Sequence, residues 1–292
     1  MIWRCRSRVF TLEERVLVMG VLNLTPDSFS DGGRFTDPQA ALEHARRMFA
    51  DGADIVDVGA ESTRPGAAPV PPDEQWRRLE GVLPALAAEG RCVSVDTASA
   101  SVAERALAAG ASIVNDVTAL GDPDMAAVVA GAGAGLVLMH MRGTPASMQR
   151  EPSYGDVTRE VLEALRDRLA AARVGGVREE CVACDPGIGF GKDVRHNLEL
   201  LARIGELREL GRPILVGASR KSFIGRLSDA PIERRLAGGL AAHALAVWGG
   251  ASVIRTHDVP ETVQAMAVAS AIRSARRESS AATREGRLSD RR

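Results

Sequence analysis

The chain of 292 residues contains very little lysine. Of its 37 basic residues 35 are arginine, and the only lysines are Lys192 and Lys221. An arginine excess most often reflects a compositional bias of the genome. In such a chain we expect lysine to be kept where a planar guanidinium cannot replace a compact ammonium. Both lysines are therefore candidates for functional positions.

Net charge, aromatic side chains and long apolar runs are scarce as well. The 37 basic and 38 acidic residues nearly cancel, which argues against a protein that coats nucleic acid. Aromatic residues make up 3%, with Tyr154 as the single tyrosine, so Ala, Val, Leu and Ile must form most of the core. The longest apolar run, 125–139, is too short and too rich in glycine for a membrane helix.

Cysteine and targeting signals point to the cellular compartment. Four cysteines do not make the disulfide framework of a small secreted protein. The first residues contain arginine but no apolar segment before Glu13, unlike a secretory signal. With 45% hydrophobic residues, the chain is expected to be a folded cytoplasmic protein that binds neither membranes nor nucleic acid.

Short apolar runs alternate with helical segments along the chain. Eight runs predict strands, at 16–22, 55–58, 92–95, 113–114, 136–139, 181–184, 214–216 and 252–254. The segments after them predict helices, at about 38–51, 73–88, 99–109, 124–132, 156–173, 194–210, 232–248 and 258–274. Strands that are apolar on both faces and alternate eight times with helices predict an α/β fold with a single (β/α)8 TIM barrel. A doubly wound open sheet is the alternative.

The two ends of the chain lie outside this pattern. Residues before about Val16 predict a short N-terminal extension, which could plug the base of the barrel. Residues 275–292 have no apolar periodicity and predict a disordered C-terminal tail. The domain is therefore expected to span residues 1–274.

Polar residues occur where each predicted strand ends. TIM barrels carry their chemistry at the C-terminal ends of the strands. Here the series starts with Asn23 after the first strand and ends with Arg255 and His257 after the eighth. The strands between are followed by Asp57, Asp96, Asn115, His140, Asp185 and the segment 218–222. Because a random distribution would not place polar residues after all eight strands, we predict one active site at this rim.

One group of rim residues is acidic and carries an amide: Asp96, Asn115 and Asp185. Carboxylates in a barrel mouth are costly to desolvate unless they receive hydrogen bonds. A heterocycle with adjacent N–H donors, such as the edge of a pterin or a guanine, would supply them. Lys221 could donate to the carbonyl of that heterocycle and keep the carboxylates ionised.

A second group suits an anion. It consists of Arg64, Arg255, His257 and the segment 219–222, and the loops after strands 7 and 8 are the usual phosphate site of this fold. Ser222 is expected to begin a helix, where free N–H groups favour negative charge. Asn23 offers a neutral oxygen, which suits a Mg²⁺ ion that holds a pyrophosphate with few protein ligands.

Eight sequence strings resemble, in order, the motifs of the dihydropteroate synthase family. They are MGVLNLTPDSFSDGG, DVGAESTRPGA, VSVDT, VND, LMHM, DPGIGFGK, VGASRKSFIG and IRTHDV, and they run from residue 19 to 259. The resemblance implies a TIM-barrel enzyme of folate biosynthesis, the target of sulfonamides. It would condense 6-hydroxymethyl-7,8-dihydropterin pyrophosphate with p-aminobenzoate, giving 7,8-dihydropteroate and pyrophosphate. It also implies Mg²⁺ as cofactor and a homodimer.

The resemblance further implies roles for the residues that match these motifs. The pterin would be bound by Asp96, Asn115, Met139, Asp185 and Lys221. The pyrophosphate would be bound by Asn23 through Mg²⁺ and by Arg64, Arg255 and His257. The p-aminobenzoate site would contain Phe29, Thr63, Arg64, Phe190 and Ser222. The residues expected to take part in catalysis are Asp31, Lys221, Arg255 and His257.

The implied chemistry is an SN1-like displacement. The dihydropterin ring can delocalise a developing cation, so the C–O bond would break before the amine attacks, with Asp31 as the negative residue near the cation. Two other functions stay open. A pterin-dependent methyltransferase barrel would keep the acidic group without needing the anion-binding group, and a paralogue without synthase activity would bind dihydropterin only.

The two lysines differ in what can be said of them. A compact ammonium at Lys221 fits between a carboxylate and a heterocycle carbonyl, where a guanidinium does not. Lys192 ends the string DPGIGFGK at the same predicted rim. It has no assigned role at this stage beyond packing of the loop or a surface charge.

Overall fold

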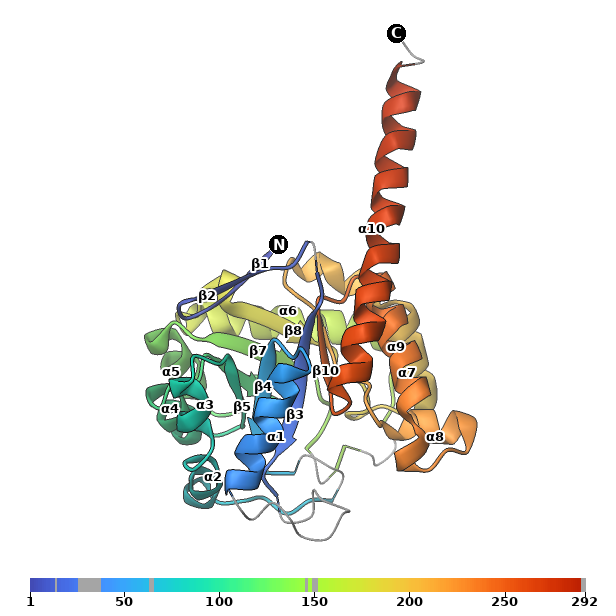
Figure 1. Cartoon of the computed structure of the whole chain (residues 1–292). Coiled ribbons are helices and arrows are strands. Elements are labelled where there is room, and N and C mark those ends of the chain that lie inside the picture. The colour runs from blue at the N-terminus through green and yellow to red at the C-terminus, as the bar shows by residue number, and fades with distance from the viewer. Residues whose placement is uncertain (14, 26–37, 63–65, 145–146, 149–151, 290–292) are drawn as a thin grey trace.

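The structure is a computed structural model. It describes residues 1–13, 15–25, 38–62, 66–144, 147–148 and 152–289, with only the backbone described from residue 277 onward. Two short strands come first, and strands then alternate with helices. Figure 1 shows the strands gathered in the middle of the molecule with the helices around them.

Eight parallel strands form the barrel. Their sheet order is β8-β7-β6-β5-β4-β3-β10-β9, and a bridge between Cys184 and Ile214 joins β8 to β9 and closes the ring. This confirms the (β/α)8 barrel and excludes the open sheet. The strands are β3 (Leu17–Asn23), β4 (Ile55–Gly59), β5 (Val93–Asp96), β6 (Ile113–Asp116), β7 (Gly135–Met139), β8 (Val182–Asp185), β9 (Leu215–Val216) and β10 (Val253–Thr256).

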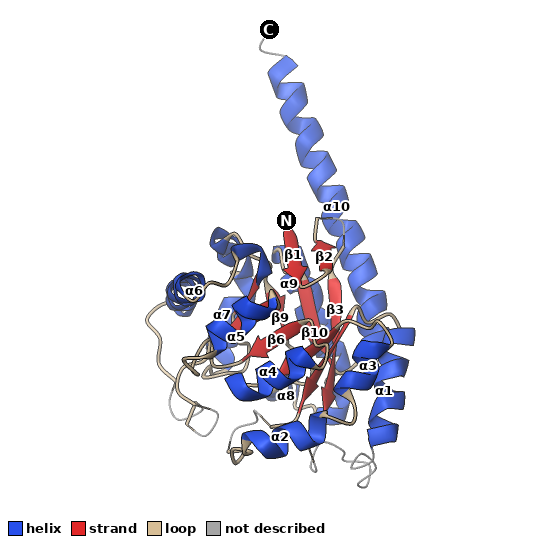
Figure 2. Cartoon of the chain, turned by 90° about the vertical axis from the view of Figure 1, so that its left-hand side faces the viewer, coloured by secondary structure: helices blue, strands red, loops and turns tan. Residues whose placement is uncertain are grey.

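Helices cover the outside of the barrel, as Figure 2 shows from a second side. The α-helices are α1 (Pro38–Ala50), α2 (Pro72–Leu79), α3 (Leu83–Ala88), α4 (Ala100–Ala108), α5 (Met125–Ala132), α6 (Val157–Val174), α7 (Val194–Ala202), α8 (Ser222–Ser228), α9 (Leu236–Gly249) and α10 (Val259–Ser289). Short 3-10 helices are η1 (Glu179–Cys181), η2 (Ile204–Leu210) and η3 (Ile232–Arg234).

Three predicted helices are divided in the structure. The segment 232–248 forms the 3-10 helix η3 and then α9. The segment 73–88 forms α2 and α3, because Pro84 has no backbone N–H for the Glu80 carbonyl and its ring would clash with that carbonyl in a continuous helix. The segment 194–210 is helical in α7 and continues as the 3-10 helix η2, which ends at Gly211 in the left-handed conformation. Ser222 begins α8, as the sequence predicted.

The inside of the barrel changes from apolar to polar along the strands. Successive side chains of a strand point alternately in and out, so inward positions recur every second residue. On β4 these are Ile55 and Asp57, and on β10 they are Val253 and Arg255. The inner apolar cluster contains Leu17, Met19, Ile55, Cys92, Ile113, Val137, Ala183, Leu215 and Val253. Two residues further along, the interior carries the polar side chains of the rim.

The N-terminal extension plugs the apolar end of the barrel, as predicted. β1 (Ile2–Cys5) and β2 (Arg8–Thr11) form an antiparallel hairpin. Trp3 and Cys5 are fully buried and join the inner cluster, and Trp3 Nε1 donates to the Cys181 carbonyl at 2.9 Å. A Cβ at Gly135 would lie 2.5 Å from Cys5 Sγ, so only glycine lets the hairpin pack this closely. All four cysteines are buried and free.

The chain ends in the long helix α10. Arg273 is buried and its Nη1 donates to the carbonyls of Val247 and Ala251, which fastens α10 to the end of α9. The Arg276 guanidinium lies 4.5 Å from the ring centre of Trp248. Beyond this point the backbone stays helical to Ser289 and extends past the barrel on the side of the hairpin (Figures 1 and 2). The domain boundary at residue 274 stays a prediction.

The plug generates a test of what holds the barrel base. Trp3→Ala removes the largest side chain of the inner cluster, and we expect it to lower the free energy of unfolding by about 3–5 kcal/mol in urea titrations. Because Trp3 lies at the end opposite the rim, both substrate KM values should stay unchanged in the folded variant. A loss below about 1 kcal/mol would contradict a structural role for the hairpin.

Candidate active site

The polar rim lies at the C-terminal ends of the strands, where the sequence placed it. Asn23 ends β3, Asp96 ends β5, Met139 ends β7 and Asp185 ends β8. Asn115 is the next-to-last residue of β6 and pairs with Asp96 in the parallel ladder. These side chains, far apart in the sequence, therefore meet at one end of the barrel.

A buried cluster of charges occupies the mouth of the barrel. Arg255 on β10 bridges two carboxylates: Nε lies 2.7 Å from Asp57 Oδ2, and Nη2 lies 2.7 Å from Asp96 Oδ2. Asn115 Nδ2 donates to the same Asp57 oxygen at 2.9 Å. The Asp57 side chain has no exposed surface, and its Oδ1 has no hydrogen-bond partner among the described residues. Removing either carboxylate would leave the buried guanidinium with half of its compensation.

This arrangement differs from the sequence interpretation in two respects. Arg255 was grouped with the anion-binding residues, yet in the structure its guanidinium pairs with the carboxylates of the acidic group. It therefore joins the two groups into one network. Asp57 was given no role, although it lies at the centre of the cluster. A carboxylate inside the apolar strand IVDVG is costly to bury, and that cost was the available sequence signal.

Desolvation shifts the titration of the rim residues. The pKa of Asp96 is raised to about 7, mainly by burial. Arg255 opposes this shift, and Asp57 adds to it. Burial likewise raises the pKa of Asp185. Desolvation and the nearby Arg255 lower the pKa of Lys221 to about 8, against the opposing effect of Asp185. Between about pH 7 and 8 the site therefore presents both an ionised Asp96 and a protonated Lys221.

The loop after β8 approaches the cluster from one side. Asp185 Oδ1 accepts a hydrogen bond from the Gly187 N–H at 2.7 Å, and its other oxygen has no hydrogen-bond partner in the described part of the chain. The Phe190 ring lies 3.9 Å from Lys221 Nζ, a cation–π contact. Two residues predicted to bind different substrates, Lys221 and Phe190, are thus in direct contact.

The loops after β9 and β10 form the remaining part of the rim. Ser219 Oγ accepts from the His257 N–H at 3.2 Å and lies 3.2 Å from His257 Nδ1. Arg220 pairs with Asp258 at 2.5 Å. Desolvation, followed by Arg255 and Arg220, lowers the pKa of His257 to about 3, so this imidazole is neutral at pH 7. A neutral ring donates one hydrogen bond to an anion and adds no charge.

Asn23 is the described residue that best fits a cation. A Cβ at Gly59 would lie 3.5 Å from Asn23 Oδ1 and 3.4 Å from the Asp96 Cβ, so the two side chains flank this glycine at the rim. Within the described residues no group of three or more His, Cys, Asp or Glu side chains could hold a metal. An ion here would need most of its ligands from a substrate.

Four predicted site residues, Phe29, Asp31, Thr63 and Arg64, lie outside the described residues. Their placement and roles stay predictions. Two surface hollows do not include the charged cluster, one of about 420 Å³ between α8 and α9 and one of about 390 Å³ beside α10. The rim is preferred as the active site because it gathers the buried charges. No described helix is long and apolar enough to cross a membrane.

Comparisons with known proteins agree with this chemistry. Residues 19–257 match the family described as "Pterin binding enzyme". The dihydropteroate synthase of Escherichia coli (strain K12) is 45% identical over 260 residues, which are 89% of this chain and 92% of the relative. That of Bacillus subtilis (strain 168) is 43% identical over 258 residues, 88% of each chain.

One relative is much longer than this chain. A probable bifunctional folylpolyglutamate synthase/dihydropteroate synthase of Haloferax volcanii is 46% identical over 268 residues. The match includes 92% of this chain but only 32% of the relative. The chain thus spans about one third of that protein, and the similarity concerns that part alone.

Solved structures have the same fold. A Yersinia pestis dihydropteroate synthase in complex with a sulfonamide drug has a TM-score of 0.90 and 41% identity, over 94% of this chain and 100% of that one. A Xanthomonas albilineans dihydropteroate synthase with 4-aminobenzoic acid has a TM-score of 0.86 and 45% identity, over 93% and 97%. The chain belongs to the dihydropteroate synthases within the pterin binding enzyme family.

Proposed function

We propose that the chain condenses 6-hydroxymethyl-7,8-dihydropterin pyrophosphate with p-aminobenzoate, giving 7,8-dihydropteroate and pyrophosphate. The observation that carries the proposal is the barrel mouth, where buried carboxylates lie next to loops able to bind an anion. A substrate with N–H donors at one end and a pyrophosphate at the other matches both halves. Sulfonamides, which resemble p-aminobenzoate, would compete for the same site.

The acidic cluster would bind the pterin. Asp185 has one oxygen occupied by the Gly187 N–H, which leaves the other for adjacent donors of a pterin edge. Asp96 likewise has one oxygen on Arg255 and the second available. Lys221, close to both carboxylates, would donate to the pterin carbonyl, with Asn115 and Met139 completing the pocket. The geometry supports this assignment, and ligand binding tests it.

The loops after β9 and β10 would bind the leaving group. His257 and Ser219 lie at this side of the rim, with Arg64 expected from the loop after β4. Asn23 ends β3 beside Gly59, and we propose that its Oδ1 is a ligand of a Mg²⁺ ion that arrives together with the pyrophosphate. When bound, this ion would neutralise the charge that develops on the departing oxygen.

The reaction needs little proton transfer from the protein. The C–O bond breaks and pyrophosphate leaves with the electron pair, while the dihydropterin ring delocalises the cation. The neutral amine of p-aminobenzoate then attacks the CH₂ carbon with its lone pair and loses a proton to solvent. The protein would therefore orient both substrates, with Phe190 and Lys221 beside the incoming amine. It would also stabilise the charge on the leaving pyrophosphate.

A second copy of the chain is the partner we propose. Leu245 and Trp248 on α9 and Val268 and Ile272 on α10 are 43–64% exposed, although α9 and α10 pack together. These four side chains, the α9–α10 patch, lie on two adjacent helices at helical spacing. Covering such a patch with its own counterpart gives a homodimer. We propose the cytoplasm as its location.

The proposed reaction and its dependence on Mg²⁺ can be tested together. With both substrates and Mg²⁺, purified protein should form dihydropteroate, and EDTA should abolish the reaction. Asn23→Ala should raise the Mg²⁺ concentration for half-maximal rate about tenfold, equivalent to about 1.4 kcal/mol for one lost ligand. The KM for p-aminobenzoate should stay within about threefold of wild type, since Asn23 is assigned to the pyrophosphate and not to that substrate. Pterin binding without product would instead indicate the non-catalytic paralogue.

A charge placed in the α9–α10 patch tests the proposed dimer. In sedimentation experiments at micromolar concentration, the wild-type chain should be a dimer and Leu245→Glu a monomer, because the variant buries a charge in the α9–α10 patch. Val174→Glu is the matched control, since Val174 is 88% exposed on α6, outside the patch. A monomeric wild-type protein, or equal dissociation by both variants, would contradict the assignment.

A further inference from the structure

Lys192 is a buried cation that the proposed reaction does not use. Only 2% of its surface is exposed. Its Nζ lies 2.9 Å from the Phe190 carbonyl, 3.0 Å from the Gly187 carbonyl and 3.0 Å from His140 Nδ1. The His140 carbonyl is a fourth, longer contact at 3.4 Å. One ammonium thus joins the loop after β8 to the loop after β7.

We propose that Lys192 is a positioning residue: its ammonium fastens the segment 187–191 and thereby fixes the Phe190 ring for p-aminobenzoate. The inference rests on the p-aminobenzoate site proposed above and deepens it. It assigns Lys192 no contact with substrate. Its effect on the reaction passes through the loop that it holds.

The loop needs such support because its own backbone provides little. Gly187, Gly189 and Gly191 all have positive φ, so the segment cannot continue a strand or a helix. It is also tightly packed: a Cβ at Gly187 would lie 1.9 Å from the His140 carbonyl oxygen. Carbonyl groups that regular structure leaves unpaired must find other donors when they are buried. The Gly187 carbonyl accepts one turn bond from the Phe190 N–H at 3.0 Å. Lys192 Nζ adds a second donor to that carbonyl and supplies one to the Phe190 carbonyl.

Two further side chains hold the same segment. Asn197 Oδ1 accepts from the Gly189 N–H at 2.6 Å, and its Nδ2 donates to the Asp193 carbonyl at 2.6 Å. The Tyr154 hydroxyl donates to the Gly191 carbonyl at 2.8 Å. Lys192, Asn197 and Tyr154, here called the loop clamp, therefore bind successive backbone groups of residues 187–191.

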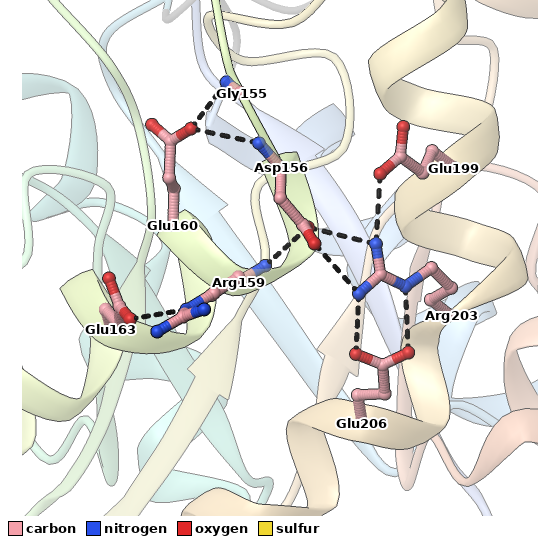
Figure 3. A network of polar contacts seen from close by, with 8 residues as sticks. All are labelled: Gly155, Asp156, Arg159, Glu160, Glu163, Glu199, Arg203 and Glu206. Atoms are coloured by element: carbon pink, nitrogen blue, oxygen red, sulfur yellow. Dashed lines mark hydrogen bonds and ion pairs between the residues drawn. The ribbon is translucent and has the colours of Figure 1, made fainter.

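The clamp is braced from outside by ion pairs. Arg142 lies over the Tyr154 ring at 4.2 Å and pairs with Glu160 at 2.6 Å. Figure 3 shows Glu160 accepting from the backbone before α6, and Asp156 joined to Arg203 at the end of α7. These pairs are largely exposed and each adds little stability. Together they fix the chain on either side of Tyr154.

The position of the loop determines where the Phe190 ring lies beside Lys221. Phe190 carries the ring that lies 3.9 Å from Lys221 Nζ. A Cβ at Gly189 would lie 2.9 Å from Lys221 Cδ, so the stem of Lys221 runs directly along this backbone. A shift of the loop would move the Phe190 ring with it, whereas Lys221 belongs to the separate loop after β9. Displacements of about 1 Å are enough to lower a rate substantially.

The chemistry of the contacts explains a lysine at this position. The carbonyls and the imidazole converge on one nitrogen, which suits the three donors of an ammonium and does not suit the flat fork of a guanidinium. Burial and then Lys192 lower the pKa of His140 to about 3, so the ring is neutral and its Nδ1 can accept in the tautomer protonated at Nε2. Desolvation also lowers the pKa of Lys192 to about 7, and Asp185 opposes that shift. In a chain that contains 35 arginines, Lys192 thus lies where an arginine does not fit.

The test compares the two substrates in Lys192→Met, which keeps an unbranched side chain one atom shorter and removes its donors. The KM for p-aminobenzoate should rise about tenfold or more, while that for the pterin substrate changes less than about threefold. Amide hydrogen exchange in 187–191 should speed up about tenfold or more, with the strands unchanged. Lys192→Arg should behave like Lys192→Met.

Arg273→Met is the matched control, because Arg273 is another buried cation bound to backbone carbonyls, far from the rim. It should lower the midpoint of urea unfolding and leave both KM values and exchange in 187–191 unchanged. Equal increases of both KM values in Lys192→Met would overturn the proposal, as that pattern marks a general structural role. Unchanged exchange in the loop would overturn it as well.

Tyr154→Phe keeps the proposal testable if Lys192→Met does not fold. Losing the hydroxyl bond to Gly191 should raise the KM for p-aminobenzoate about threefold and speed exchange in the same segment. No change in either measurement would contradict the clamp. A wild-type protein that makes no dihydropteroate would instead refute the proposed function, and the exchange measurement would still decide on the clamp.

Discussion

The mouth of this barrel depends on one buried cation shared by two carboxylates. Asp57 and Asp96 point into a space from which water is largely removed, and two negative charges there repel each other. Arg255 lies between them at 2.7 Å from each, and Asn115 donates to Asp57 as well. Because the strands themselves carry the compensating side chains, the buried carboxylates are stabilised before a ligand binds.

Because side chains alternate along each strand, the polar site and the apolar base lie at opposite ends of the same barrel. Inward positions are apolar near the hairpin and polar two residues later, so one set of strands provides both the core and the chemistry. The loops past the strands follow another rule. They have glycine-rich backbones that regular hydrogen bonding does not support, and buried side chains such as Lys192 take over this task. Precision at the rim therefore comes from polar contacts between loops.

The sequence predicted the architecture well because repeated local signals encode it. Eight apolar runs, each ending in polar residues, identify the barrel and its rim without any knowledge of contacts. Pairings between distant residues leave no such signal: nothing local shows that Arg255 faces Asp57, or that Lys192 meets carbonyls of two loops. The break between α2 and α3 was missed because amphipathic spacing continues across it. Asp57 is the exception, because a carboxylate inside an apolar strand is a signal that the local sequence itself contains.

The central claim is that Arg255 keeps Asp96 ionisable in a buried site. Burial raises the pKa of Asp96 to about 7 while Arg255 lowers it, so losing Arg255 must raise it further. The direct measurement is a pH titration of the Asp96 ¹³Cγ signal, assigned with Asp96→Asn, in wild type and Arg255→Met. The account predicts a midpoint near pH 7 in wild type and one at least about one unit higher in the variant. Equal midpoints in the two proteins, or titration near pH 4 in both, would contradict it.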